Sequence, residues 1–402
     1  MKVMKFSTRK VITFLIIIIL FFQNPLEMCM PLFNYVDEIL AMIGILYFLC
    51  DICRKKISVR EAIIVLLLTA FVSCGLLGNA LYADNSVYNI LSDIFVCHKF
   101  FAVIYLSYHC LSKYLNKNIV SFGVMISKSI IVLILSLAIT DFVFEIWDSQ
   151  VRYGIKSLKL FWGHSTYLAA ALAFLMMILL LSRKKETVWI LLDASLIVLT
   201  LRSKAIAFSI IFVILYFIVV SKKKKVNFWK ITPFLALIAL IVGLNNIKFY
   251  FIQLENSARS ILLRTSIQIA KDYFPFGVGF ASFGSNIAND AYGRFYYQYG
   301  LDLFKETSKY SGFLNDSFWP SIIAQSGVIG SVFYILTHCV IVNNIFNSEM
   351  NNRKFLAGSI GIYLYLILSS VAEPAFNNSI AVPLGIMLGI FLSENRRGEK
   401  CS

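Results

Sequence analysis

"MKVMKFSTRKVITFLIIIILFF" (residues 1–22) places a basic segment directly before an uninterrupted apolar run. A secretory leader has the same order, but no small-residue cleavage site follows in "QNPLEMCMP" (residues 23–31). We therefore expect a first membrane span that is retained. The rest of the chain repeats this pattern, because short basic segments separate long apolar runs.

The composition is that of a membrane protein. Hydrophobic residues make up 59% of the 402 residues and charged residues only 15%. Soluble globular chains carry about 45–50% apolar and about 25% charged residues. The 8 cysteines are scattered, mostly inside apolar runs, and predict no disulfide framework.

Apolar runs set the expected topology. A spanning helix needs about 20 mostly apolar residues, and about twelve runs qualify. They lie near residues 11–30, 33–50, 61–81, 88–110, 119–141, 165–182, 187–202, 205–220, 230–247, 317–342, 355–372 and 375–393. We expect an all-α polytopic membrane protein with about twelve transmembrane helices, in which residues 1–402 form a single integral membrane domain.

Positive charge marks one side of these predicted spans. With the N-terminus in the cytoplasm, the inner segments hold about 23 of the 37 Lys and Arg residues. The outer loops near residues 79–88 and 371–378 hold none. We therefore expect both termini in the cytoplasm. The net charge of +15 is explained by topology and by contact with membrane lipid, which argues against a nucleic-acid partner.

One outer segment, at residues 248–316, is long enough to predict a functional loop. Within it, Arg259, Arg264, Gln268 and Lys271 fall mainly on one face of a helix, and apolar residues such as Leu262 fall on another. This pattern predicts an interfacial helix at the membrane surface.

A proline and several glycines follow that helix in "FPFGVGFASFG" (residues 274–284). Gly277 and Gly279 fit the start of a dinucleotide fingerprint, but Ser282 stands where the next glycine is required. No Walker lysine with Ser or Thr follows either. We expect the glycines to let the chain turn back over the membrane rather than to bind a nucleotide.

Basic residues at the outer ends of spans need a reason, because insertion disfavours them there. Arg202 and Lys204 occupy such a place in "TLRSKAIAF" (residues 200–208). One interpretation is a site for an anionic group, and the other is snorkelling to lipid head groups. Arg259 and Arg264 either bind phosphate, which suits the planar guanidinium, or belong to the polar face of a surface helix.

Asn315 and Asp316 lie where the long loop meets the next predicted span. Asp316 is either the N-cap of that span or a general base at the membrane surface. Within the spans, Lys99, Lys128 and Asp193 predict either a buried Lys–Asp pair or a proton relay. The 4 histidines lack ligand spacing and there is no DxD pair, so we expect no metal and no cofactor.

Five segments, in this order, resemble the O-antigen polymerase and ligase superfamily, which includes the Wzy-type polymerases of oligosaccharide repeat units. They are "FFQNPLEMCMPLFNYVDEILAMIGIL" (residues 21–46), "RYGIKSLKLFWGHSTYLAA" (152–170), "TLRSKAIAF" (200–208), "ARSILLRTSIQIAKDYFPFGVGFASFG" (258–284) and "NDSFWPSIIAQSGVIG" (315–330). Asn315-Asp316 stands where the family has His-Asn. Since the ligase branch is associated with that histidine as base, its absence favours the polymerase branch.

The resemblance implies a glycosyltransferase of the C-like superfamily at the outer face of the bacterial inner (cytoplasmic) membrane. Its substrate would be a polyprenyl diphosphate-linked oligosaccharide, polymerised into O-antigen or capsular polysaccharide, with a chain-length regulator protein as a further partner. Arg202, Lys204, Arg259 and Arg264 would bind the diphosphate. Asp316, Arg264 and Arg202 would be catalytic, and the substrate-binding residues would be Arg152, His164, Asn315 and Tyr296.

Two alternatives stay open at this stage. The first is an O-antigen ligase or another glycan-transferring relative. The second is a repeat-unit flippase, which also has about twelve spans. Flippases usually have short outer loops, whereas this chain carries a long one.

Overall fold

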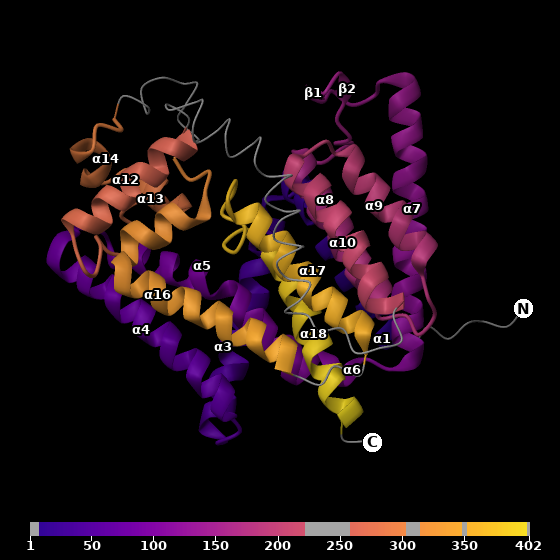
Figure 1. The fold of residues 1–402 in the computed structure, drawn as a ribbon, viewed down its shortest axis with the longest axis horizontal. Coiled ribbons are helices and arrows are strands. Elements are labelled where there is room, and N and C mark those ends of the chain that lie inside the picture. The colour runs from indigo at the N-terminus through magenta and orange to yellow at the C-terminus, as the bar shows by residue number, and fades with distance from the viewer. Residues whose placement is uncertain (1–7, 222–257, 303–313, 348–351, 400–402) are drawn as a thin grey trace, which may run out of the picture.

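The computed structural model describes residues 8–221, 258–302, 314–347 and 352–399 of the chain. Helices make up most of this part, which confirms the expected all-α class (Figure 1). The helices are α1 (Thr8–Phe21), α2 (Gln23–Cys29), η1 (Pro31–Tyr35), α3 (Val36–Cys53), α4 (Val59–Tyr82), α5 (Val87–Leu106), η2 (Ser107–Leu111), α6 (Ser112–Tyr114), α7 (Lys117–Phe144), α8 (Ser165–Leu180), α9 (Thr187–Leu199), α10 (Ser203–Ser221), α12 (Ala258–Asp272), α13 (Asn286–Ala291), α14 (Arg294–Gln298), α16 (Phe318–Asn347), α17 (Arg353–Ser370) and α18 (Ala381–Glu399). Two short strands, β1 (Val151–Arg152) and β2 (Ile155–Lys156), form an antiparallel hairpin.

Among the described helices, 5 are long and apolar enough to cross a membrane. They are α4, α7, α10, the run Val87–Tyr114 that begins with α5, and most of α16. The number becomes 6 if α1 and α2, which meet at 75°, form one span. These helices indicate a membrane-embedded protein. The expected total of about twelve stays a prediction, and the run at 230–247 lies outside the described residues.

Polar caps explain where several of the apolar helices begin. Ser58 starts α4 with a capping box, in which its side chain accepts from the backbone of Glu61 and the Glu61 side chain accepts in return. The side chains of Asn116 and Asn352 cap α7 and α17 in a similar way. Each cap satisfies backbone N–H groups that have no partner within the helix. The basic segment at residues 54–56 therefore ends just before the defined start of α4, whereas Arg353 and Lys354 follow the cap of α17.

The sequence predicts an amphipathic helix at residues 258–272, and α12 is that helix. Its location at the membrane surface stays a prediction. Leu262 and Ile269 are fully buried on one face, and Arg264 and Gln268 are exposed on the other. Figure 1 shows α12, α13 and α14 gathered at one end of the molecule, which we call the loop end.

The glycine-rich segment after α12 turns back as expected, but it is buried among helices instead of lying on a surface. Phe280 and Phe283 are fully buried. The Val278 N–H donates to the Ala324 carbonyl and the Gly279 N–H donates to the Gln325 carbonyl, each at 2.9 Å. Both carbonyl groups belong to α16. These carbonyls are available because α16 breaks at Gly327, where φ is 63° and ψ is −165°.

Helices α4 and α5 hold the other side of this segment. Asn79 of α4 pairs with the Phe280 peptide through both of its amide atoms, at 2.8 and 2.9 Å. The carboxylate of Asp93 in α5 accepts from the Ala281 N–H at 2.7 Å. A non-helical backbone inside a membrane protein needs such internal partners. The segment thus locks α4, α5 and α16 together beneath the loop end.

Glycine is required here because the backbones approach so closely. A Cβ at Gly279, where φ is +88°, would lie 2.4 Å from the backbone nitrogen of Asn79. A Cβ at Gly327 would lie 2.3 Å from the Pro275 carbonyl oxygen. The spaced glycines of the sequence therefore serve packing between the buried segment and its neighbouring helices.

Two of the intramembrane lysines form ion pairs. Lys99 of α5 lies 2.5 Å from Asp37 of α3, and Lys128 of α7 lies 2.6 Å from Glu186 before α9. The buried Lys–Asp pair that the sequence predicts is therefore present, but its acid is Asp37. Asp193 of α9 is fully buried and is not the partner of either lysine.

Candidate functional site

Charged side chains from segments far apart in the sequence meet near the loop end of the helix bundle. They come from the start of α8, the junction of α9 and α10, the start of α12, the residues before α16, and the connector between α17 and α18. We call His164, Arg202, Lys204, Arg259, Asp316 and Glu373 the charge cluster. Three of these residues are basic (Arg202, Lys204 and Arg259), two are carboxylic acids, and the sixth is a histidine.

Arg202 is placed by a break between two helices. Leu201, with φ at 50°, separates α9 from α10, and Arg202 follows it. The Nε atom of Arg202 donates to the Ser165 hydroxyl at 2.7 Å, and Nη2 contacts Nε2 of His164. Both partners stand at the beginning of α8. The structure therefore brings together two residues, Arg202 and His164, that the sequence singled out separately.

His164 is a neutral partner for this arginine. Burial lowers the pKa of His164, and so do the nearby cations Arg202, Lys204, Arg152 and Lys159; together they bring it to about 4. The imidazole is therefore uncharged at neutral pH and can accept a hydrogen bond from the guanidinium. Since the ring adds no positive charge, it holds Arg202 without repelling it.

Lys204 forms an ion pair with Glu373 in the connector between α17 and α18. The Nζ and Oε1 atoms lie 2.5 Å apart, and each side chain is only 13% exposed. The sequence reading missed Glu373. A signal was present in the sequence. Glu373 is the only acid in the predicted outer loop at residues 371–378, which has no Lys or Arg, and Lys204 needed an acidic partner.

Arg259 lies 3.6 Å from Asp316, measured from Nη2 to Oδ2. The same nitrogen donates to the Ala372 carbonyl at 3.2 Å, directly beside Glu373. Arg259 therefore bridges the segment before α16 and the α17–α18 connector. The helix α16 begins at Phe318, and no described hydrogen bond joins its backbone to the Asp316 carboxylate. This geometry favours a site residue over a helix cap.

The other charges of the cluster shift the pKa of Asp316. Burial raises the pKa of Asp316 above its ordinary value of 3.8, and the Glu373 carboxylate raises it further, while Arg259 and Lys204 oppose the shift. An aspartate with a raised pKa is a better proton acceptor than an ordinary surface aspartate. The cluster thus combines guanidinium groups, which suit phosphate, with a carboxyl group that suits proton transfer.

Further hydrogen bonds hold the connector in place. Ser317, next to Asp316, donates to the Val371 carbonyl at 3.3 Å, and the Trp319 indole donates to Ser370 at 3.0 Å. The start of α16 and the end of α17 are therefore tied together on both sides of the charge cluster. Such support keeps the side chains of the charge cluster in a fixed geometry.

Two other residues from the sequence analysis, Arg152 and Asn315, lie around this cluster. Arg152 sits in the β1–β2 hairpin and donates to Gln150 at 3.0 Å. Neighbouring Tyr153 contacts the Ser203 hydroxyl at 3.2 Å, so the hairpin borders the start of α10. Asn315 donates to Asn286 at 2.7 Å and joins the α16 start to α13.

Arg264 lies on the exposed face of α12. It follows Arg259 by five positions, which is about 140° around an α-helix. Arg259 points to Asp316, so the two arginines face different directions. The structure therefore separates Arg264 from the charge cluster, although the sequence treated both alike.

Tyr296 is placed differently from what we expected of a substrate-binding residue. The side chain is fully buried, its hydroxyl accepts from the Gly284 N–H at 2.8 Å, and its ring stacks between Phe283 and Tyr292. The ring is buried because it fills the core beneath α13 and α14. Tyr296 supports the loop end and presents no face to a ligand.

The donor set fits an anion better than a metal ion. In the described part of the chain, no group of three or more His, Cys, Asp or Glu side chains is arranged to hold a metal. The two acids of the charge cluster already pair with Arg259 and Lys204. Comparison with known proteins returned no match, either among family models or among curated proteins.

Proposed function

We propose that this protein is a glycosyltransferase that polymerises polyprenyl diphosphate-linked oligosaccharide repeat units into O-antigen or capsular polysaccharide. The reaction would take place at the outer face of a bacterial cytoplasmic membrane. One observation carries the proposal: two guanidinium groups and a half-buried aspartate meet at one end of an apolar helix bundle. A lipid-linked diphosphate would present its charge at that level of the membrane.

The arginines would bind the leaving group. Arg202 and Arg259 would contact the diphosphate oxygens of the donor, and Lys204 would add a third positive charge. As the bond between the anomeric carbon and the diphosphate oxygen breaks, negative charge builds up on the diphosphate. Fixed cations stabilise that charge in the transition state without reorganising. Guanidinium groups suit the task because they offer two parallel donors to one phosphate.

Asp316 would act as the base for the acceptor sugar. The hydroxyl of the acceptor sugar attacks the anomeric carbon, its oxygen forms the new glycosidic bond, and its proton passes to the Asp316 carboxylate. The raised pKa of Asp316 favours this transfer. The lipid diphosphate leaves with the bonding electron pair. The growing chain has then moved from its lipid carrier onto a new repeat unit.

The remaining cluster residues would position these groups. His164 and Ser165 orient Arg202, and Glu373 holds Lys204 beside the site. Arg152 in the β1–β2 hairpin would contribute at the edge. Arg264 stays a prediction of the sequence, and its position on α12 argues for a smaller role than that of Arg259.

Surface glycan from a deletion strain tests the proposal. Loss of the polymerase leaves single repeat units attached at the cell surface while long chains disappear. Units stranded on the cytoplasmic leaflet would instead identify a flippase. Complete loss of attached glycan, with free polymer still present, would identify a ligase. Complementation with Arg202→Ala should reproduce the deletion, and wild-type gene should restore long chains.

A further inference from the structure

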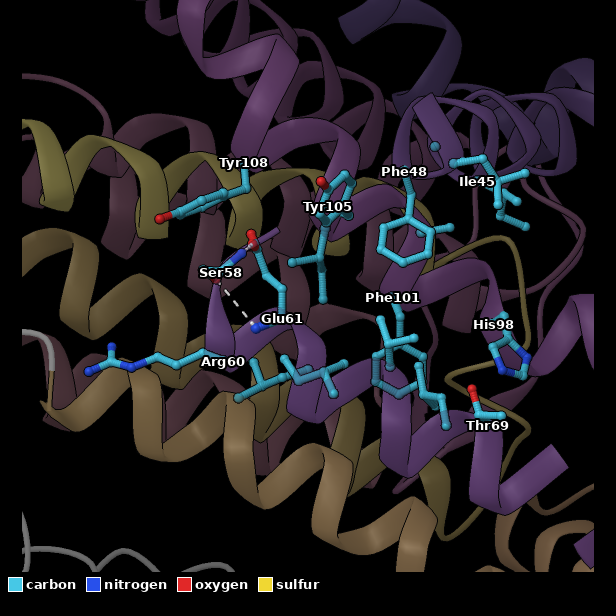
Figure 2. A pocket seen from close by; sticks show the side chains of 18 of the residues that line it. Ile45, Phe48, Ser58, Arg60, Glu61, Thr69, His98, Phe101, Tyr105 and Tyr108 are labelled. Atoms are coloured by element: carbon cyan, nitrogen blue, oxygen red, sulfur yellow. Dashed lines mark hydrogen bonds between the residues drawn. The ribbon is translucent and has the colours of Figure 1, made fainter. Parts of the chain in front are cut away.

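A second region, which shares no residue with the charge cluster, forms a long groove. It has a volume of 1190 Å³ and is walled mainly by α3, α4 and α5 (Figure 2). Pockets for drug-sized ligands measure about 300–1,000 Å³, so this groove is large. Its α4 wall runs from Ser58 to Val72, which is about 21 Å of helix.

The walls are mainly apolar, although Thr69 and His98 also line them. Ile64 and Leu68 of α4 face Ile94 and Phe101 of α5 across it, with Phe48 of α3 on a third side. One leaflet of a bilayer contributes about 15 Å of hydrocarbon, half of the full thickness. The groove is therefore long enough to hold the full depth of a lipid chain.

One end of the groove is polar. Ser58, Arg60, Glu61 and Tyr108 lie there, and Figure 2 shows Arg60 extending from this end. The Glu61 carboxylate already has partners, because the Ser58 hydroxyl donates to it at 2.6 Å and His109 lies 2.5 Å away. The negative charge of Glu61 is thus engaged within the protein.

Further positive charge lies next to this polar end in the sequence. Arg54, Lys55 and Lys56 directly precede the start of α4, and they and Arg60 are exposed. Within the described residues, none of these four side chains forms an ion pair. Their charge is therefore available to a ligand at the mouth of an apolar groove.

We propose that this groove binds an anionic phospholipid, with one acyl chain along α4 and the phosphate at Arg60 and the Arg54–Lys56 segment. Each part of such a lipid meets matching chemistry. A soluble anion would leave the apolar length unfilled, and a zwitterionic lipid would leave the basic mouth uncompensated. Basic residues near a membrane surface each contribute about 1 kcal/mol to binding of anionic lipid. The proposal does not depend on the glycosyltransferase activity.

Thermal unfolding of the purified full chain in neutral detergent tests this site. Titration with phosphatidylglycerol should raise the melting temperature more than titration with phosphatidylcholine. Arg60→Gln should weaken the phosphatidylglycerol effect about fivefold in apparent affinity, because one phosphate contact is lost. Lys117→Gln, an exposed basic residue outside the groove, is the matched control and should bind as the wild type does.

A second variant tests the apolar part. Val65→Trp places a large ring in the groove and should weaken binding of phosphatidylglycerol even though all cations remain. Equal stabilisation by the two lipids in the wild type would overturn the proposal. So would an equal loss in Lys117→Gln and Arg60→Gln, because it would show a general surface-charge effect. Wild-type binding by Val65→Trp would show that no chain occupies the groove.

Discussion

The guanidinium group of Arg259 lies 3.6 Å from the carboxylate of Asp316, although α12, α13 and α14 separate the two residues along the chain. The same guanidinium reaches the Ala372 carbonyl next to Glu373. Arg259 thereby joins three segments of the charge cluster. The first prediction concerns the acid of this pair.

Asp316→Asn should lower polymerisation about 10²–10⁴-fold, the usual contribution of a general base. The amide is nearly isosteric and cannot accept the proton, while the fold should be retained. Activity on repeat units is the measurement, with the melting temperature measured on the same sample. Asp290→Asn, an exposed acid on α13, is the control and should behave as the wild type does. Full activity in Asp316→Asn would remove Asp316 as the base.

The pH profile of the reaction should follow the charges around Asp316. Because its pKa is raised above 3.8, the acidic limb of the activity profile should lie above pH 3.8. Arg259→Gln removes a charge that lowers this pKa, so the limb should move to higher pH. Glu373→Gln removes a charge that raises it, so the limb should move to lower pH. If the acidic limb moved in the same direction in both variants, Asp316 would not be the group that sets the profile.

The two arginines of α12 provide a matched pair. Arg259→Ala should reduce the rate about ten- to a hundredfold, in line with loss of a hydrogen bond between charged groups. Arg264→Ala should reduce it much less, because Arg264 lies on the exposed face. The reverse order of effects would show that the diphosphate lies on the other side of α12, as the sequence alone allowed.

The ion pair of Lys204 and Glu373 should contribute to stability as well as to the site. Glu373→Gln leaves a lysine that is 13% exposed without its partner, and loss of one member of a buried pair costs about 3 kcal/mol. Adding Lys204→Met should recover most of that free energy of unfolding. Equal stability of the single and double variants would mean that the pair is not coupled.

Replacing Gly279 should destabilise the fold more than replacing a glycine in an open loop. Gly279→Ala forces a Cβ to within 2.4 Å of Asn79, whereas Gly154, with φ at +75°, has no atom within 4 Å of the added carbon. Gly154→Ala should therefore cost only about 1–2 kcal/mol, the backbone strain of a left-handed residue, and Gly279→Ala should prevent normal accumulation of the protein. The amount of folded protein in membranes distinguishes the two.

The sequence predicted the helical class because apolar runs and basic segments need only local residues to be recognised. The amphipathic pattern of α12 was also within its reach, and so was the choice of Arg202 and His164 as candidate site residues. Their contact was not, because it depends on how α8 packs beside the α9–α10 junction. The pairing of Glu373 with Lys204 could not be identified from the sequence for the same reason, because only the tertiary structure brings the two together.

Two predictions were wrong because the residues concerned are buried in the structure. Tyr296 belongs to an aromatic-rich stretch of the long loop, and composition alone cannot distinguish a ring that faces a ligand from one that fills a core. The glycine-rich segment looked like a surface turn, yet its N–H groups pair with carbonyls that become free only where α16 breaks at Gly327. Neither partner could be identified from spacing along the chain.

The central claim is tested most directly by reconstitution. Purified protein in lipid vesicles would be supplied with a polyprenyl diphosphate-linked repeat unit, and the products would be separated by length. We predict a ladder of multiple units with the wild type and only the single unit with Arg202→Ala, at equal amounts of folded protein. A ladder of the same length and yield from Arg202→Ala would contradict the account.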